Sequence, residues 1–252
     1  MEPVYTPVIA VAKLWFAFQG LRFTVHGAEN VPRTGGAVMA INHIGYLDFA
    51  YAGLTARPSG RLVRFMAKDE VFRHRISGPL MRGMHHIPVD RQAGASSFRA
   101  AVTALKNGEI VGVFPEATIS RSFELKEFKA GVVRMAAAAD VPILPTVVWG
   151  SQRIWTKDHP KRLGRSGIPI MLSVGRPLAA GRREDADRVA EQLRAEMTAL
   201  LHQAQAEYPP LTGPDRVFLP ARLGGDAPTP ERAAQLDAAE AEERAARRKD
   251  QG

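Results

Sequence analysis

Apolar runs that end abruptly in polar residues constrain the fold of this chain most. Four such runs lead directly into Asn42-His43, Lys68, Asp90-Arg91 and Pro115-Glu116. Segments with helical periodicity, such as 96–106 and 126–139, separate the runs. Buried strands alternating with helices predict an α/β fold with a mixed, largely parallel sheet flanked by helices. Because ligands of such folds collect beyond the strand ends, we expect the functional site there.

The remaining pattern divides the chain into three parts. We expect an N-terminal amphipathic helix within 1–20, a domain over 21–207, and an extended strap with a polar tail over 208–252. Further strands are predicted at 22–26, 142–149 and 168–174, and further helices at 49–56, 70–81 and 182–207. Ser77-Gly78-Pro79 predicts a break inside the helix of 70–81. The segment 231–249 is rich in Ala, Glu and Arg and has no wide apolar face, so we expect an exposed helix or disorder and assign it no chemistry.

The charge of the chain lies in its body. The formal net charge is +8, and residues 1–212 hold 27 basic and 18 acidic side chains. A basic body suits anionic partners, namely a membrane surface, nucleic acid or phosphorylated substrates. The chain has no cysteine, which excludes disulfides, thiolate metal sites and a cysteine nucleophile, and which fits a reducing compartment.

The N-terminal segment is the most apolar part of the chain. Val8 to Gln19 is interrupted by Lys13 and carries three aromatic residues, but no stretch reaches the length that spans a bilayer. It has no basic segment before its apolar part and no small-residue cleavage site, so we do not expect a signal peptide. Two interpretations stay open: a helix packed on the core, or a helix lying in a membrane interface.

His43 and Asp48 have the spacing of a catalytic pair. The strand ending at Ile41 aims the imidazole of His43 beyond the sheet, and Asp48 follows five residues later. A carboxylate that orients an imidazole is half of a catalytic triad, without its nucleophile. The alternative for this pair alone is a structural hydrogen bond.

Other polar residues offer weaker signals. Arg91 could grip a phosphate with its planar guanidinium, or form a salt bridge with Asp90. Lys68 could contact phosphate or cap a strand end. His85 and His86 alternate along a strand and cannot easily share one metal, so we expect no metal site.

The basic segment 157–165 follows Trp149 and Trp155. This segment could bind nucleic acid, could bind phospholipid head groups, or could be a solvated loop without a partner. Between the two partners we favour head groups over nucleic acid.

At this point four blocks of the sequence, taken in order, resemble the glycerolipid acyltransferases, in particular the 1-acylglycerol-3-phosphate O-acyltransferase (lysophosphatidic acid acyltransferase) family. They are Asn42 to Asp48, Ile87 to Arg91, Phe114-Pro115-Glu116-Ala117-Thr118, and Val141 to Pro145. The resemblance extends over about residues 22 to 178.

The resemblance implies an activity and roles for residues. An acyl chain would pass from an acyl thioester, carried by coenzyme A or acyl carrier protein, to a hydroxyl of a lysophospholipid such as 1-acylglycerol-3-phosphate, giving phosphatidic acid. His43 would be the general base and Asp48 its orienting group, with no covalent enzyme intermediate. The predicted substrate-binding residues are Arg91, Glu116, Asn42, Lys68, Thr118 and Arg121.

The implied setting is the cytoplasmic face of a membrane, bound peripherally to an anionic surface. We expect no cofactor, no metal and no nucleic acid. Two alternatives remain: the same chemistry on glycerol 3-phosphate or a glycolipid acceptor, and a non-catalytic lipid-binding protein of this fold.

Two departures from the family pattern affect these roles. Ala117 stands where the family has glycine, which matters if the position needs a positive φ. Ile119-Ser120 separates Thr118 from Arg121, where the family commonly has arginine directly after threonine. Arg121 therefore stands two residues later than in the family pattern.

Overall fold

A computed structural model of the chain describes residues 2–90, 94–181 and 184–249. Within them the strands are β1 (Arg22–His26), β2 (Ala37–Ile41), β3 (Val63–Lys68), β4 (Ile87–Val89), β5 (Ile110–Val113), β6 (Ile143–Trp149) and β7 (Pro169–Val174). The α-helices are α1 (Tyr5–Gln19), α2 (Asp48–Ala52), α3 (Asp69–Arg73), α4 (Ser77–Gly83), α5 (Gly94–Lys106), α6 (Gly131–Ala139), α7 (Ala186–Glu207) and α8 (Pro230–Lys249).

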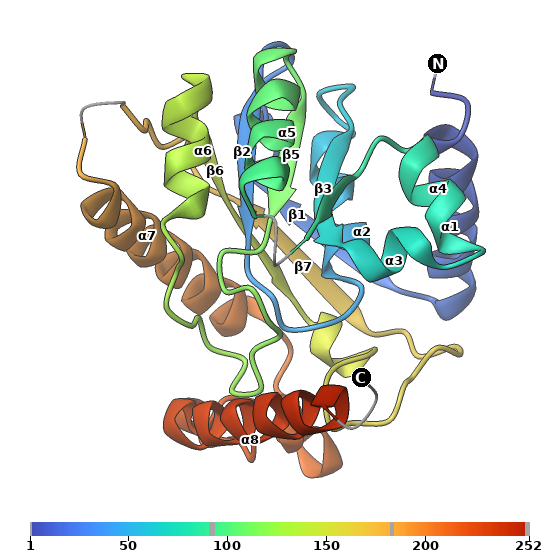
Figure 1. Cartoon of the computed structure of the whole chain (residues 1–252). Coiled ribbons are helices and arrows are strands. Elements are labelled where there is room, and N and C mark those ends of the chain that lie inside the picture. Colours follow the sequence, from blue (N-terminus) through green and yellow to red (C-terminus); the bar gives the residue numbers. More distant parts are fainter. Residues whose placement is uncertain (1, 91–93, 182–183, 250–252) are drawn as a thin grey trace.

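The strands form one sheet of seven in the order β1-β7-β6-β2-β5-β3-β4 (Figure 1). Every pairing is parallel except β6 with β7, which is antiparallel. The predicted mixed, largely parallel sheet is therefore confirmed. Because β2 to β6 all point the same way, their carboxyl ends lie at one edge of the sheet.

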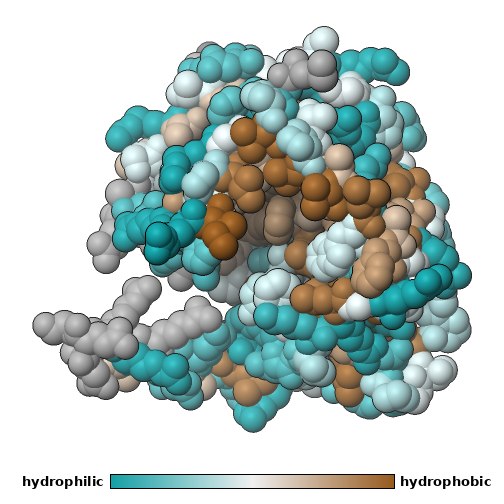
Figure 2. All heavy atoms as spheres, turned by 90° about the vertical axis from the view of Figure 1, so that its right-hand side faces the viewer, coloured by the Kyte–Doolittle hydropathy of each residue, from teal (hydrophilic) through white to brown (hydrophobic). Residues whose placement is uncertain are grey.

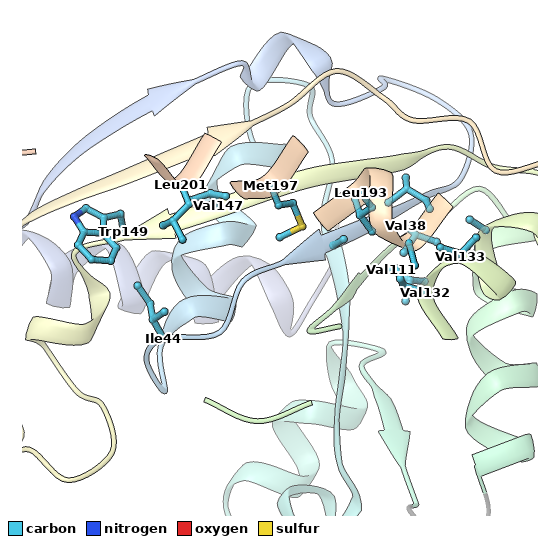
Figure 3. Close-up of a cluster of buried hydrophobic side chains, with 14 of the residues drawn as sticks. Val38, Ile44, Val111, Val132, Val133, Val147, Trp149, Leu193, Met197 and Leu201 are labelled. Carbon is cyan, nitrogen blue, oxygen red and sulfur yellow. The ribbon is translucent and has the colours of Figure 1, made fainter. Parts of the chain in front are cut away.

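Helices cover both faces of the sheet, because successive apolar side chains along its central strands point to opposite faces. In β2, Val38 and Ala40 pack with α5, α6 and α7, while Met39 and Ile41 point to the opposite face and pack with α1 and α2. Figure 3 shows the first of these two cores, where Leu193, Met197 and Leu201 of α7 lie over the sheet. A sheet buried on both faces is held rigidly, and so are its strand ends.

The N-terminal helix α1 packs on the core, which is one of its two predicted interpretations, and its place in a membrane interface stays a prediction. Phe16 is buried and its ring packs against Phe23 and Tyr51. Leu14 and Phe18, on the same helix, are 72% and 64% exposed. The helix therefore packs on the core and also presents apolar side chains to the outside.

Two predicted helices have different limits in the structure. The predicted break within 70–81 is present, since α3 ends at Arg73 and α4 begins at Ser77. It lies at residues 74–76, and Ser77-Gly78-Pro79 forms the first turn of α4, where proline needs no backbone N–H. The helix predicted from residue 126 begins only at Gly131. The segment before it binds the loop after β5 instead, where the N–H groups of Lys126 and Lys129 donate to the side chain of Glu116 and the carbonyl of Pro115.

The C-terminal segment is more integrated than the predicted strap and tail. Short 3-10 turns at Gly213–Phe218 and Ala221–Leu223 follow α7, and Tyr208, Leu211 and Phe218 are buried in the core with α7. Packing therefore continues past the predicted domain limit at 207. The polar segment beyond it forms the helix α8, which lies at the foot of the molecule in Figure 1.

Candidate active site

The strand ends bring the predicted polar residues to one edge of the sheet. β2 lies between β5 and β6, and β3 lies on the other side of β5. The residues that follow β2, β5 and β6, which are His43, Glu116 and Ser151, lie in loops that contact one another directly. We call residues 42–47 the base loop and residues 114–130 the glutamate loop.

His43 and Asp48 form the pair that their spacing predicts. Nδ1 of His43 lies 3.1 Å from Oδ2 of Asp48. The His43 ring stacks on Phe114 with centroids 4.2 Å apart, and 19% of its side chain is exposed. With the carboxylate accepting, the hydrogen bond requires the proton on Nδ1, which leaves Nε2 as the free acceptor. The imidazole is thus oriented by Asp48 and partly exposed.

Asp48 is fixed by four donors although it is completely buried. Oδ2 accepts from the backbone N–H of Ile44 and Gly45 at 2.7 and 2.8 Å, besides His43. Oδ1 accepts from the hydroxyl of Ser151 at 2.5 Å. Sequence reasoning missed Ser151, since nothing in the sequence says that β6 lies beside β2. Its signal was available: it follows the apolar run 143–149 in the same way that His43 follows β2.

Gly45 has a packing role in the base loop. A Cβ at this position would lie 3.1 Å from the backbone oxygen of Ser151 and 3.1 Å from that of Trp155. A larger residue would therefore push the base loop away from the loop that follows β6.

Glu116 is buried beneath the base loop. Its Oε1 accepts from the backbone N–H of His43 at 2.8 Å, and its Oε2 accepts from the backbone N–H of Lys126 at 3.1 Å. Burial raises the pKa of Glu116 to about 8, against the opposing effect of these two donors and of the Lys126 ammonium. Glu116 therefore joins two loops, and its predicted contact with substrate stays a prediction.

The glutamate loop turns sharply after Glu116. Ala117 has φ of +61°, so the position does require the left-handed conformation that glycine adopts without cost. The hydroxyl of Thr118 accepts from Nζ of Lys126 at 2.8 Å. Thr118, predicted to bind substrate, is therefore engaged within its own loop.

Asn42 and Arg121, both predicted to bind substrate, have partners within the protein. The side chain of Asn42 is completely buried and pairs with the backbone of Val148, donating at 3.0 Å and accepting at 2.7 Å. The guanidinium of Arg121 is buried and bound by Asp158, Asp237 and Glu240. Both side chains are thus engaged by other parts of the protein, and their predicted contact with substrate stays a prediction.

Lys68 and Arg91 are the other two residues predicted to bind substrate. Lys68 is exposed at the carboxyl end of β3, in register with Val89 of β4. Arg91 lies outside the described residues, so its phosphate contact stays a prediction. The alternative salt bridge between Arg91 and Asp90 stays open for the same reason.

The two neighbouring histidines are separated in the structure. His86 is buried, accepts from the backbone N–H of Phe65 at 3.0 Å, and has its pKa lowered to about 4 by desolvation and by Arg64. His85 is exposed. In the described part of the chain, no group of three or more His, Asp or Glu side chains is arranged to hold a metal ion.

Residues 157–165, predicted to face head groups, are partly used inside the protein. Lys157 binds Asp237 and Glu240, and Arg162 binds Asp215 at 2.8 Å. Nζ of Lys161 lies 4.2 Å from the centroid of the Trp155 ring.

The His43–Asp48 pair and Glu116 thus lie at adjacent strand ends of a mixed, largely parallel sheet. Residues 22–149 match the family model described as Acyltransferase, and the chain belongs to this family. The resemblance identified from the four sequence blocks is thereby confirmed.

Particular relatives are similar over much of their length. The 1-acyl-sn-glycerol-3-phosphate acyltransferase of Bacillus subtilis (strain 168) is 32% identical over 180 residues, covering 71% of this chain and 84% of that protein. The enzyme of the same name from Borreliella burgdorferi is 29% identical over 167 residues, covering 64% of this chain and 62% of that protein. The crystal structure of the 1-acyl-sn-glycerophosphate (LPA) acyltransferase PlsC from Thermotoga maritima matches the fold with a TM-score of 0.67 at 20% identity, over 81% of each chain.

Proposed function

We propose that this chain transfers an acyl group from an acyl thioester to a hydroxyl of a lysophospholipid such as 1-acylglycerol-3-phosphate, giving phosphatidic acid. The observation that carries the proposal is the His43–Asp48 pair, in which Nδ1 of His43 lies 3.1 Å from Asp48 and the imidazole is partly exposed. The names of the Bacillus and Borreliella relatives support the choice of acceptor.

The proposed chemistry needs no enzyme nucleophile, because the substrate supplies the hydroxyl. Nε2 of His43 takes the proton from the acceptor hydroxyl as its oxygen attacks the thioester carbonyl carbon. Asp48 stabilises the imidazolium that forms. When the intermediate collapses, the carbon–sulfur bond breaks, the ester remains on the acceptor, and the thiolate takes up the proton held by His43. General base catalysis of this kind contributes about 10²–10⁴-fold.

The donor is the thioester of coenzyme A or of acyl carrier protein, and we assign no cofactor, metal or nucleic acid to the reaction. In the proposal Arg91 holds the acceptor phosphate and Lys68 adds positive charge at the neighbouring strand end. Glycerol 3-phosphate and glycolipid hydroxyls are the alternative acceptors, and a lipid-binding protein without catalysis is the alternative class.

One experiment separates these functions. Purified protein is mixed with acyl-CoA or acyl carrier protein thioester and with each acceptor in turn, and thiol release and lipid products are measured. We expect thiol release that depends on 1-acylglycerol-3-phosphate, with phosphatidic acid as product. Transfer only to another acceptor would replace the proposed substrate, and lipid binding without thiol release would contradict the proposed chemistry.

We further propose that the protein works while bound peripherally to an anionic membrane surface, at its cytoplasmic face. Among the described residues no helix is long and apolar enough to cross a bilayer. Figure 2 shows apolar side chains gathered around a hollow on the face that carries α1, α3 and α4. Leu14 and Phe18 of α1 and Ile76, which is 74% exposed beside α4, are exposed large apolar residues of these elements. Such a patch is typical of a membrane-contacting surface.

Vesicle co-sedimentation tests this placement. Leu14→Ser combined with Phe18→Ser should weaken binding to phosphatidylglycerol-containing vesicles. Val25→Ser, on the edge strand β1, is the control because Val25 is also an exposed large apolar residue but belongs to none of α1, α3 and α4. Unchanged binding of the α1 variant would contradict the proposed membrane contact.

A further inference from the structure

The polar helix α8 touches the loops of the active site through one face. Ala233, Asp237 and Glu240 follow each other at helical spacing, and Ala233 is buried. Asp237 and Glu240 extend this face toward the glutamate loop, which reaches down to α8 in Figure 1. The residues matched by the family model end at 149, so this helix lies outside the shared region.

Three cations from two different loops meet these two carboxylates. Arg121 and Lys126 belong to the glutamate loop, and Lys157 belongs to the lysine loop, residues 154–168. Asp237 binds all three, and Glu240 binds Arg121 at 3.0 Å and Lys157 at 2.9 Å. One helix therefore ties the two loops to each other.

Both loops hold the base loop close to these ion pairs. The N–H of Ser120, next to Arg121, donates to the carbonyl of His43 at 2.7 Å. The hydroxyl of Thr156, next to Lys157, donates to the carbonyl of Ile44 at 2.7 Å. The contacts of α8 with Arg121 and with Lys157 are thus each one residue away from a hydrogen bond to the base loop.

Lys126 provides a second connection, to Glu116. Its Nζ binds Asp237 and donates to Thr118 at 2.8 Å, while its backbone N–H donates to Glu116. Glu116 in turn accepts from the N–H of His43. Asp237 therefore contacts the glutamate loop at two residues, Arg121 and Lys126, and both residues connect it to the base loop.

The charges of α8 and of the two loops balance one another where they meet. Arg121 also binds Asp158, so three cations face three carboxylates, of which α8 supplies two. The side chains of Arg121 and Lys157 are only 7% and 11% exposed. Removing one side of a largely buried ion network leaves uncompensated charge and costs far more than losing a surface pair. Without α8 the three cations would repel one another and push the two loops apart.

We propose that Asp237 and Glu240 are positioning residues for acyl transfer, which act through Arg121, Lys126 and Lys157 to hold the base loop in its active geometry. The inference rests on the proposed function for its kinetic consequences only. Its structural consequence, the order of the base loop, is measurable whatever the substrate is.

The test uses the full chain with Asp237→Asn and Glu240→Gln together. The matched control is Glu242→Gln with Glu243→Gln, which removes two exposed carboxylates from the same helix. In the first variant, hydrogen exchange should become faster at the amides of His43, Ile44 and Gly45, while exchange in β2 stays unchanged. In the control variant, exchange at all these amides should stay unchanged. Equal exchange in both variants would overturn the proposal even if the wild-type chain turned over none of the acceptors.

Kinetics give the second readout. With the acceptor that the wild type uses, kcat should fall about tenfold or more, since small displacements of catalytic groups cost this much. KM for the acceptor should change less than threefold, and adding Lys157→Met should restore part of kcat by removing one unbalanced cation. An increase in kcat, or a fall in acceptor KM, would show that α8 blocks the site and would overturn the positioning role. Wild-type inactivity on every acceptor would instead count against the proposed function.

Discussion

The backbone N–H of His43 donates to Oε1 of Glu116 over 2.8 Å, and this bond joins the ends of β2 and β5 beneath the imidazole. Glu116 is therefore part of the support of the proposed base. Its buried carboxyl has a pKa raised from 4.5 to about 8, and this shift has a consequence for stability.

The pH dependence of stability should differ between the wild type and Glu116→Gln. The folded state holds a proton on Glu116 up to about pH 8, whereas the unfolded chain releases it near pH 4.5. Stability of the wild type should therefore fall as pH rises between these values, by a few kcal/mol at most, and the variant should lack this component. Urea unfolding at several pH values between 5 and 9 measures both. Parallel curves would show that Glu116 is a carboxylate throughout this range.

Ser151→Ala should weaken the orientation of Asp48. The buried Oδ1 of Asp48 would lose its donor, which costs about 1–3 kcal/mol of stability. We expect kcat to fall with little change in KM, because a less constrained Asp48 holds the imidazole less well. Ser59→Ala, which removes a hydroxyl bonded to Ala56, is the control. Equal kcat values for the two variants would argue against a role of Ser151 in orienting the pair.

Ala117→Gly should stabilise the fold slightly. Alanine at φ of +61° costs about 1 kcal/mol, and glycine would remove this cost. Part of the gain is lost, because glycine gives the unfolded chain more conformational freedom. We expect a net gain of roughly 0.5 kcal/mol in the free energy of unfolding. Ala100→Gly, at an exposed position of α5, should instead lose about 1 kcal/mol. If both variants lose stability equally, strain at Ala117 is absent.

Arg91→Ala should raise KM for the phosphorylated acceptor and leave KM for the thioester nearly unchanged, because the proposed contact is with the acceptor phosphate. Arg99→Ala, on the exposed side of α5, is the control for a lost positive charge. Initial-rate measurements with each substrate varied in turn distinguish the two effects. An effect limited to the thioester would contradict the phosphate contact.

The sequence predicted the parts of the site that depend on one segment at a time. Apolar runs ending in polar residues locate His43 and Glu116, since burial of a strand and the polarity of its loop are both local properties. The order of the strands is not local, so neither Ser151 beside Asp48 nor Val148 beside Asn42 could be predicted. The same holds for α8, whose composition indicates a solvated helix, while its partner Arg121 lies 116 residues away from Asp237.

The central claim is that His43 is the general base of acyl transfer, and thiol release by His43→Ala tests it most directly. The measurement uses acyl-CoA and 1-acylglycerol-3-phosphate, with circular dichroism and thermal unfolding to establish that the variant is folded. We expect thiol release to fall by about 10²-fold or more in a variant that stays folded. Turnover near the wild-type rate would contradict the assignment of His43 as the base.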